Sequence, residues 1–550
     1  MMILADDPAW TAKRHAQRLR CGTTVHHALA APDSEGMKGL NTDLVLAIDC
    51  STTASKAVAW DEAGVAEAEG RAPLDLQTPH PGWGEQDARQ WWDATVEAIR
   101  QVTRRADSRR IAAICVTHQR ETFVPVDDEG NPLRNGILWL DERSRPQLAA
   151  LDHQFGNDNL HALTGRPPSM TQSLPKLVWL AEHEPELIRD AAHIVDVHAF
   201  LVHRLSGTWT TSLACADPMG IVDLRRGTWA TNLIQEIGLR ADQFVAIVPP
   251  GKVIGTVTSD AAAQTGLSAG TPIAAGAGDG QAASLGAGIT GPGRAFVNLG
   301  TAIAGGALSD SYVTDRAYRT CVGPIPGTFV LESVLRGGTA TVSWFMDHFA
   351  DPRLQGEAFD VYERQAAALP PGADGLVLVP YWNNVMNPYW DPAATGLVIG
   401  WSTAHRRHHL YRAILDGIAF EHRLAMEGIV ASTGTPLTEH VILGGGSRSP
   451  LWCQVMADVL GAPVLRARSA DATNLGAGVL AAWTAGWFAT PREAAQAMTG
   501  TTEMVLPRPD ESAAYDRLYR EVYVHLFPAI RDAMDRLTEL TVSAAADERR

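Results

Sequence analysis

The sequence predicts an α/β protein built from two duplicated domains that face each other across a cleft. Two observations support this prediction. A buried strand, a hydroxyl-rich turn and a second strand occupy residues 44–60, and a similar unit returns over residues 294–306, about 250 residues later. Helical patterns fill the intervals between the strands. A cleft between two domains is a favoured site for a small ligand.

The first unit combines an apolar strand with a polar turn. Residues 44–49 (Leu-Val-Leu-Ala-Ile-Asp) form an apolar run that ends in Asp49, which is typical of a buried strand. The turn that follows carries Ser51, Thr52, Thr53 and Ser55, and residues 56–60 form the second strand. In the second unit the turn is Asn298-Leu299-Gly300-Thr301-Ala302. An internal duplication explains this similarity.

Helical periodicity predicts the main helices between the strands. They cover residues 88–103, 176–184, 341–349, 410–429, 451–460 and 513–540. Pro528 should kink or divide the last of these, because proline removes a helical hydrogen bond. Trp91, Trp92 and Tyr515 lie at helical spacing, which favours core packing over a cofactor role.

The composition is that of a globular protein that binds a small ligand. The 550 residues are 45% hydrophobic and 20% charged, which suits two or more domains with large cores. The 46 basic and 62 acidic residues give a net charge of −16, and the basic residues are dispersed, so we expect no nucleic-acid partner. No apolar run reaches the roughly 18 residues that a membrane span needs. Six scattered cysteines without a CxxC pair favour reduced thiols, so we expect a soluble protein of the cytoplasm.

Residues 1–42 show no pattern that joins the first strand. They contain a basic patch and a polar stretch, and Met37 lies seven residues before that strand. We expect an N-terminal extension that is disordered or foreign to the native protein.

Six motifs together resemble the FGGY carbohydrate kinases, the group that contains glycerol kinase and xylulose kinase. The resemblance runs from about Leu44 to Trp487. The motifs are Asp49-Cys50-Ser51-Thr52-Thr53, Gln119-Arg120-Glu121-Thr122, Trp139-Leu140-Asp141-Glu142-Arg143, Gly278-Asp279, Gly300-Thr301 and Gly444-Gly445-Gly446-Ser447-Arg448-Ser449. This resemblance implies two actin-like, ribonuclease H-like ATPase domains: a sugar-binding domain over residues 43–290, which carries the catalytic Asp, and a nucleotide-binding domain over residues 291–540. It also implies phosphorylation of a sugar or polyol hydroxyl, with ATP and Mg²⁺ as cofactors.

Asp279 is the candidate general base. It ends a strand among glycines and opens a helical pattern, so a substrate can approach its backbone closely. Taken alone, the residue could equally be a helix cap. In the resembled family the corresponding Asp accepts or orients the proton of the attacking hydroxyl.

The resemblance also assigns the phosphate and metal contacts. Asp49 would face Mg²⁺ through water. The nucleotide contacts would come from the two turns, from a nearby lysine and from the late glycine run, namely Ser51, Thr52, Thr53, Lys56, Gly300, Thr301, Gly444, Gly445, Gly446 and Ser447. Ser51 replaces the glycine that is usual in this hairpin, so we regard Thr53 as the firmer contact.

The resemblance places the acceptor sugar beside Arg120 and Glu121, a donor–acceptor pair suited to vicinal hydroxyls, with Trp139 as an aromatic wall. Core packing of Trp139 is an equal alternative, and a surface ion pair is the alternative for Arg120 and Glu121. Gly280 stands where glycerol and xylulose kinases usually carry an amide, and Gln281 is a candidate replacement.

The acceptor is the least determined feature. Thr171 stands where glycerol kinases carry a substrate-contacting Tyr, which disfavours glycerol, whereas residues 79–87 and the Trp91-Trp92 pair look more like pentulose kinases. D-Xylulose is therefore the first candidate, with other ketoses and four- or five-carbon polyols as alternatives. A non-catalytic sugar or nucleotide sensor on the same fold is a separate hypothesis, because fold does not fix function. The oligomeric state stays open, a homodimer included.

Overall fold

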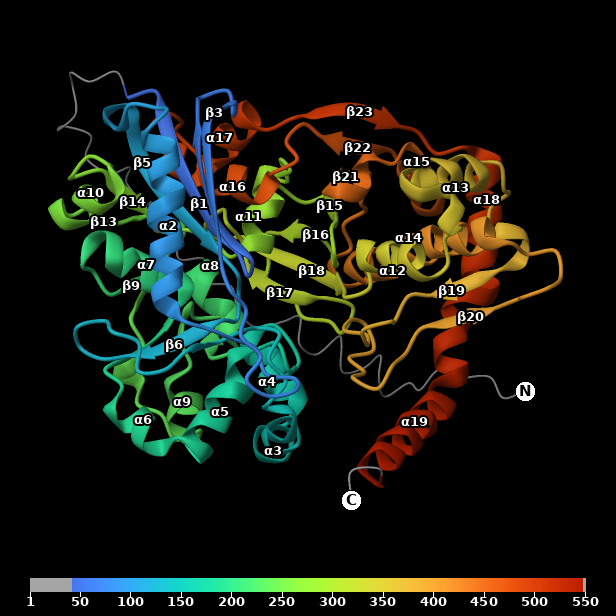
Figure 1. Cartoon of the computed structure of the whole chain (residues 1–550), viewed down its shortest axis with the longest axis horizontal. Helices are drawn as coiled ribbons and strands as arrows, with labels where there is room; N and C mark the ends of the chain where they lie inside the picture. The colour runs from blue at the N-terminus through green and yellow to red at the C-terminus, as the bar shows by residue number, and fades with distance from the viewer. Residues whose placement is uncertain (1–41, 548–550) are drawn as a thin grey trace. The chain divides into compact units, whose positions relative to one another are not determined.

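Two sheets of the same design form the centre of the chain. The computed structural model describes residues 42–547. The first sheet contains, in spatial order, β13 (Val253–Thr256), β14 (Pro272–Ala274), β5 (Ile111–His118), β1 (Leu44–Cys50), β2 (Ala54–Trp60) and β3 (Ala66–Pro73). The second contains β17 (Arg319–Val322), β18 (Phe329–Leu335), β16 (Ile303–Ser309), β15 (Arg294–Leu299), β21 (Glu439–Leu443), β22 (Val464–Ala467) and β23 (Thr501–Val505) (Figure 1).

The pairing directions repeat from one sheet to the other. β1 runs antiparallel to β2 and parallel to β5. In the same way, β15 runs antiparallel to β16 and parallel to β21. Both sheets therefore share the core β3-β2-β1-β5-β14 pattern, which reads β18-β16-β15-β21-β22 in the second. The predicted duplication and the predicted α/β class are confirmed.

β1 is apolar because both of its faces are covered. Leu44, Leu46 and Ile48 pack into one core cluster together with helix α2 (Ala88–Thr103), while Val45 and Ala47 pack into another with helix α16 (Ala472–Thr484). All five side chains are completely buried. Burial of a large aliphatic side chain stabilises a fold by roughly 1.5–3 kcal/mol, so this strand is a strong anchor for the turn that follows it.

A close helix pair fixes the start of helix α11 (Asp279–Gly286), which follows β14. Helix α16, which follows β22 of the second sheet, packs directly against α11 (Figure 1). A Cβ atom at Gly286 would overlap the backbone of Ala472, and one at Gly476 would overlap the backbone of Ala282. The two glycines thus bring the helix backbones into contact at Ala282 and Gly286, and Asp279 begins the same helix three residues before Ala282.

Several helices and most of a smaller sheet lie between β5 and β14 in the sequence, and one strand of that sheet, β4, precedes β5. The sheet has the order β4 (Glu85–Gln86), β7 (Gly136–Ile137), β6 (Phe123–Val126) and β8 (His193–Asp196). The helices include α3 (Arg145–Phe155), α4 (Asn157–Thr164), α5 (Ser173–His183), α7 (Val197–Ser206) and α8 (Leu213–Ala216). This segment supplies several side chains that surround Asp279.

The predicted helices are present, with one difference at the C-terminal end. They are α2, α5, α12 (Thr339–His348), α14 (Arg407–Thr433) and α15 (Pro450–Leu460). The last predicted helix is divided into α18 (Pro509–Leu518) and α19 (Val524–Asp547) by a π-helical turn at Tyr519–Tyr523, and Pro528 itself lies inside α19. Widening the preceding turn relieves the clash between a proline ring and the carbonyl four residues earlier, so the division precedes the proline.

The remaining expectations concern the thiols, the helices and the N-terminus. Five of the six cysteines lie in the described part of the chain, and all five are buried free thiols. Within residues 42–547, no helix combines the length and the apolar character that a membrane crossing requires. The predicted N-terminal extension lies outside the described residues, except for residue 42.

Candidate active site

Asp279 stands at the first position of α11, directly after the chain leaves the first sheet. Its side chain is 43% exposed, and its Oδ1 atom accepts the backbone N–H of Gly280 at 2.7 Å. At Gly276, a Cβ atom would overlap the backbone carbonyl of Val116 in β5, so glycine is needed where the chain passes this strand. The carboxylate is therefore held by the backbone of its own helix, while its exposed part can contact a ligand.

Arg120 follows β5 and holds Asp279 in an ion pair. The Nε atom of Arg120 lies 2.6 Å from Oδ1 of Asp279. The two outer nitrogens bind Glu332 of β18, with Nη1 at 2.9 Å from Oε2 and Nη2 at 3.2 Å from Oε1. Arg120 is almost completely buried, whereas Asp279 is 43% exposed, so water screens this ion pair less than one between two exposed side chains.

Glu121, the other predicted sugar contact, does not bind Arg120 in this structure. Glu121 has φ of 65°, an uncommon conformation for a residue with a side chain, and its carboxylate binds other arginines. Its Oε1 atom lies 3.3 Å from Nη1 of Arg166 and 3.1 Å from Nη1 of Arg319. Glu121 is 4% exposed, so in this structure its carboxylate holds Arg166 and Arg319 and is not open to a sugar.

Gln281 is also held by buried hydrogen bonds next to Arg120. Its side chain is fully buried, its Nε2 atom donates to Ala214 O and to Asp217 Oδ1 at 3.0 Å each, and its Oε1 atom accepts Nη1 of Arg120 at 3.2 Å. The predicted substrate contact of Gln281 is therefore not supported. A residue one position along a helix points in another direction, which is why Gln281 cannot replace a side chain at position 280.

A buried charge network surrounds the Arg120–Asp279 pair. Each of its three guanidinium groups contacts two carboxylates: Arg120 contacts Asp279 and Glu332, Arg319 contacts Glu121 and Glu332, and Arg166 contacts Glu121 and Asp217. The three cations and four carboxylates of this network are thus nearly balanced.

Two carboxyl groups of this network have shifted pKa values. Burial opposes ionisation of Glu332, but the charges of Arg120 and Arg319 outweigh it and hold the pKa of Glu332 at about 2. Burial raises the pKa of Asp217 to about 7, although Arg166 and the backbone N–H of Val322 act in the opposite direction. Sequence reasoning missed Glu332, although a single carboxylate inside the apolar strand Phe329–Leu335 is a detectable signal.

Two of the three hydroxyl groups in the β1–β2 turn are hydrogen-bonded to other groups of the protein. The Oγ of Ser51 donates to Ala54 O at 2.9 Å and closes the turn. The Oγ1 of Thr52 donates to Gln119 at 3.0 Å and accepts the indole N–H of Trp139 at 2.9 Å. Thr53 is exposed. The hydroxyls of Ser51 and Thr52 are therefore not free for phosphate, and Thr53 is the available one.

Every polar atom of Trp139 has a hydrogen-bond partner. Its indole binds Thr52, its backbone N–H donates to Thr122 Oγ1 at 3.1 Å, and its carbonyl accepts Nζ of Lys176 at 3.2 Å. The residue is half-buried. A fixed, partly exposed ring is suited to form an aromatic wall.

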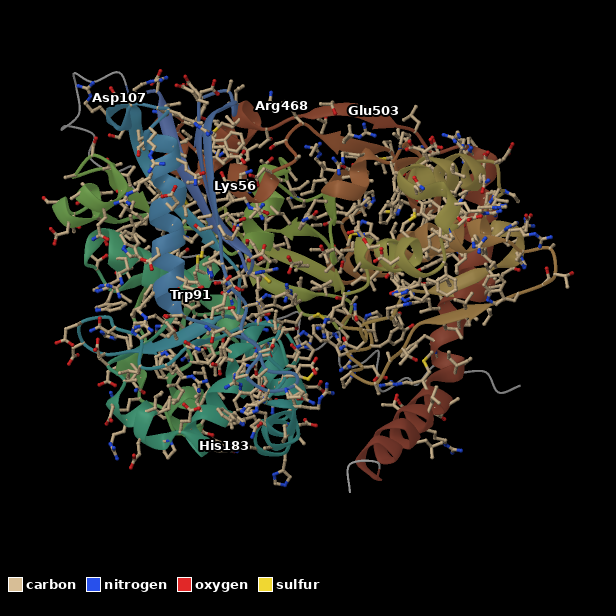
Figure 2. The ribbon with its side chains drawn as sticks, viewed as in Figure 1. Lys56, Trp91, Asp107, His183, Arg468 and Glu503 are labelled. Atoms are coloured by element: carbon tan, nitrogen blue, oxygen red, sulfur yellow. The ribbon has the colours of Figure 1, made fainter. Side chains whose placement is uncertain are left out.

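Lys56 lies opposite Asp49 in the β1–β2 pair, as its register shows, and Figure 2 labels it on β2. Its Nζ atom lies 2.8 Å from Asp471 and 3.0 Å from Glu69. The predicted phosphate contact is therefore not supported, because two carboxylates already neutralise this charge.

Asp49 fits a hard divalent cation. Its Oδ1 atom is buried and has no hydrogen-bond partner among the described residues. Burial raises the pKa of Asp49, and the charges of Asp471 and Asp279 raise it further, while Lys56 acts in the opposite direction. No cluster of three or more His, Cys, Asp or Glu side chains that could hold a metal occurs in residues 42–547. Mg²⁺ usually keeps several waters and uses one or two carboxylates plus phosphates, so a single protein ligand is sufficient.

The second turn and the late glycine run lie around the end of β15. The carbonyls of Gly300 and Thr301 accept N–H groups from the start of α12 at 2.8 and 3.2 Å, and Thr301 is exposed. Gly444 has φ of +83°, and a side chain there would overlap Asn298. Gly445 is exposed, with no atom within 4 Å of an added Cβ.

Gly446 and Ser447 are less available than Gly445. A Cβ at Gly446 would lie 2.6 Å from the ring of Trp452. Ser447 is buried, and its hydroxyl donates to Gly444 O at 2.7 Å, so it stabilises the glycine turn and does not offer a free hydroxyl.

Comparison with known proteins identifies the family. The model of the FGGY family of carbohydrate kinases, N-terminal domain, matches residues 44–286, and that of the C-terminal domain matches residues 295–485. The chain belongs to the FGGY family of carbohydrate kinases. It is therefore a carbohydrate kinase, of a family that uses ATP as the phosphate donor.

Individual relatives differ in the substrate that they are named for. The crystal structure of xylulose kinase from Rhodospirillum rubrum is similar to this kinase with a TM-score of 0.83 and 29% identity, covering 90% of this chain and 100% of that one. An autoinducer-2 kinase of Yersinia enterocolitica is 30% identical over 80% of this chain and 86% of its own length. A gluconokinase of Bacillus licheniformis is 25% identical over 89% of this chain and 97% of its own length. The kinase has the two-domain, actin-like ATPase fold of this family.

Proposed function

We propose that this kinase transfers the terminal phosphoryl group of ATP to a hydroxyl group of an uncharged sugar or polyol, with D-xylulose as the first candidate. The observation that carries the proposal is the exposed carboxylate of Asp279, held at the start of α11 by Nε of Arg120 at 2.6 Å. Residues 43–290 would form the sugar-binding domain, and residues 291–540 the nucleotide-binding domain.

In the proposed reaction, Asp279 accepts or orients the proton of the attacking hydroxyl. Arg120 fixes the direction of the carboxylate, and Trp139 provides a flat wall for the carbon chain. Phosphoryl transfer needs positioning and charge neutralisation more than covalent catalysis. Exposed groups of the two turns, Thr53 and Thr301, and the open backbone at Gly445 would contact the nucleotide. Asp49 would hold the waters of Mg²⁺, which when bound neutralises phosphate charge.

The charge balance around Asp279 favours an uncharged acceptor. Arg120, Arg319 and Arg166 each already contact two carboxylates, so this network offers no cation that lacks an anionic partner. A sugar acid would add a negative charge beside Asp279, Glu332 and Glu121, which is unfavourable in a poorly solvated site. Neutral ketoses and polyols add none, and they can use the carboxylate of Asp279 as an acceptor.

The test is acceptor-dependent release of ADP with Mg·ATP. The panel contains D-xylulose, other pentuloses, four- and five-carbon polyols, autoinducer-2 and D-gluconate, and the Asp279→Asn variant is the control. Stimulation by a neutral sugar or polyol that disappears in the variant supports the proposal. Stimulation by gluconate alone would contradict the uncharged acceptor, and ATP binding without stimulation by any member would favour a sensor.

A further inference from the structure

Glu332 connects the two sheets at the site. Its side chain is fully buried in β18, and its two oxygens bind the two outer nitrogens of Arg120. The Oε2 atom also accepts Nε of Arg319 at 2.6 Å. Arg120 follows β5 of the first sheet, whereas Glu332 and Arg319 belong to the second. The direction of Arg120 therefore depends on a carboxylate from the other sheet.

Gly280 provides the space for this ion pair. A Cβ atom at position 280 would overlap Oε1 of Glu332 and would lie 2.6 Å from Nη2 and 2.9 Å from Cζ of Arg120. Any side chain there must displace the carboxylate or the guanidinium. The Arg120–Glu332 pair therefore occupies the space that a side chain at position 280 would need.

The geometry restricts how Arg120 can bind Asp279. A guanidinium group prefers to bind a carboxylate with two parallel hydrogen bonds. Glu332 binds Nη1 and Nη2, so the end of the guanidinium faces Glu332 and its Nε edge faces Asp279, where Nε lies 2.6 Å from Oδ1. The side chain of Asp279 is 43% exposed beside this contact, so its carboxylate can also accept the hydrogen of an acceptor hydroxyl.

We propose that Glu332 and Gly280 are positioning residues for phosphoryl transfer: Glu332 holds the outer nitrogens of Arg120 so that its Nε edge faces Asp279, and Gly280 leaves the room for it to do so. This inference rests on the proposed role of Asp279 as general base. Neither residue touches the reacting atoms.

The kinetic test compares Glu332→Gln, Gly280→Ala and the double variant, with Gly356→Ala as the matched control, because nothing lies within 4 Å of a Cβ at Gly356. We expect kcat to fall by about 10- to 100-fold in both single variants, since small misplacements of catalytic groups have effects of this size. The KM for ATP should stay within about twofold of the wild type, which a general loss of structure would not allow. The double variant should be no slower than the slower single variant, because both changes disrupt the same pair. An unchanged kcat in Glu332→Gln, or multiplicative effects in the double variant, would overturn the proposal.

A crystal structure of the full-length Glu332→Gln variant tests the inference without an acceptor. A guanidinium of Arg120 that has turned relative to Asp279 supports the positioning role, and Arg120 in its original place refutes it. If Glu332→Gln does not fold, the same structure of Gly280→Ala decides the question, since that variant keeps the buried charges. If the wild-type protein shows no acceptor-dependent ADP release, the proposed function fails, whereas this structural result still stands.

Discussion

The Nε atom of Arg120 lies 2.6 Å from Oδ1 of Asp279, and the same guanidinium binds Glu332 of the second sheet. The candidate base is thus oriented by a residue that both sheets position. The orientation of the Asp279 side chain at the start of α11 therefore depends on how the two sheets are placed relative to each other. In two-domain kinases, catalysis depends on bringing groups of both domains together, so this ion pair is a natural centre for mutational tests.

Asp279→Asn should lower kcat by about 100- to 10,000-fold, the usual contribution of general acid–base catalysis. The amide keeps the shape of the side chain but cannot accept a proton, so the KM for ATP should change little. Asp107→Asn is a matched control, because Asp107 is also 43% exposed and also pairs with an arginine, at 2.7 Å. Steady-state ADP release measures both variants, and equal turnover in the two would exclude Asp279 as the base.

Glu332 should make a large contribution to stability that disappears in acid. Its pKa is about 2 in the folded protein and 4.5 ordinarily, so the contribution is complete above pH 4.5 and is lost as the pH falls from 4.5 towards 2. A difference of this size corresponds to about 3 kcal/mol. Urea unfolding midpoints of the wild type should therefore fall steeply over that range, and those of Glu332→Gln should fall less. Parallel curves for the two proteins would contradict this assignment.

Asp49→Asn should raise the Mg²⁺ concentration needed for half-maximal activity by about 10-fold, because the amide removes the negative charge from the one carboxylate assigned to the cation. The unfolding midpoint should not fall, since Oδ1 of Asp49 has no hydrogen-bond partner among the described residues that could be lost. Titration of activity with Mg²⁺ at saturating nucleotide gives the measurement. An unchanged Mg²⁺ requirement would remove Asp49 from the metal site.

Much of the fold was predictable because local sequence carries it. β1 is a continuous apolar run since both faces are covered, and the repeated turn at Gly300 and Thr301 revealed the duplication. The position of Asp279 followed in the same way, from glycines after a strand. These signals are contained within about ten residues.

The partners of the charged residues were not predictable, because they come from distant segments. Glu332 lies 212 residues from Arg120, and no spacing rule joins them. A lysine beside a polar turn suggests a phosphate contact for Lys56, but the sequence does not show that Asp471, which precedes α16, binds this lysine in the fold. In the same way, the contacts of Glu121 with Arg166 and Arg319, which lie 45 and 198 residues away, leave no mark in the sequence.

Lys176→Met should destabilise the segment that carries Trp139. The Nζ atom of Lys176 is buried, and its three N–H groups are shared among four backbone carbonyls, those of Trp139 at 3.2 Å, Met170 at 2.7 Å, Thr171 at 2.8 Å and Gln172 at 3.2 Å. Methionine keeps a similar volume but leaves these carbonyls without their donor, and an unsatisfied buried polar group costs about 1–3 kcal/mol.

We therefore expect the Lys176→Met variant to unfold at a lower urea concentration and to show a raised KM for the acceptor, because the aromatic wall loses one of its supports. Lys252→Met is the control, since Lys252 is exposed. A variant with lowered stability but an unchanged acceptor KM would show that Lys176 holds the fold and not the sugar site. If the KM for ATP rises as much as the KM for the acceptor, the substitution disturbs the whole active site. That result would contradict a specific role of Trp139 in sugar binding.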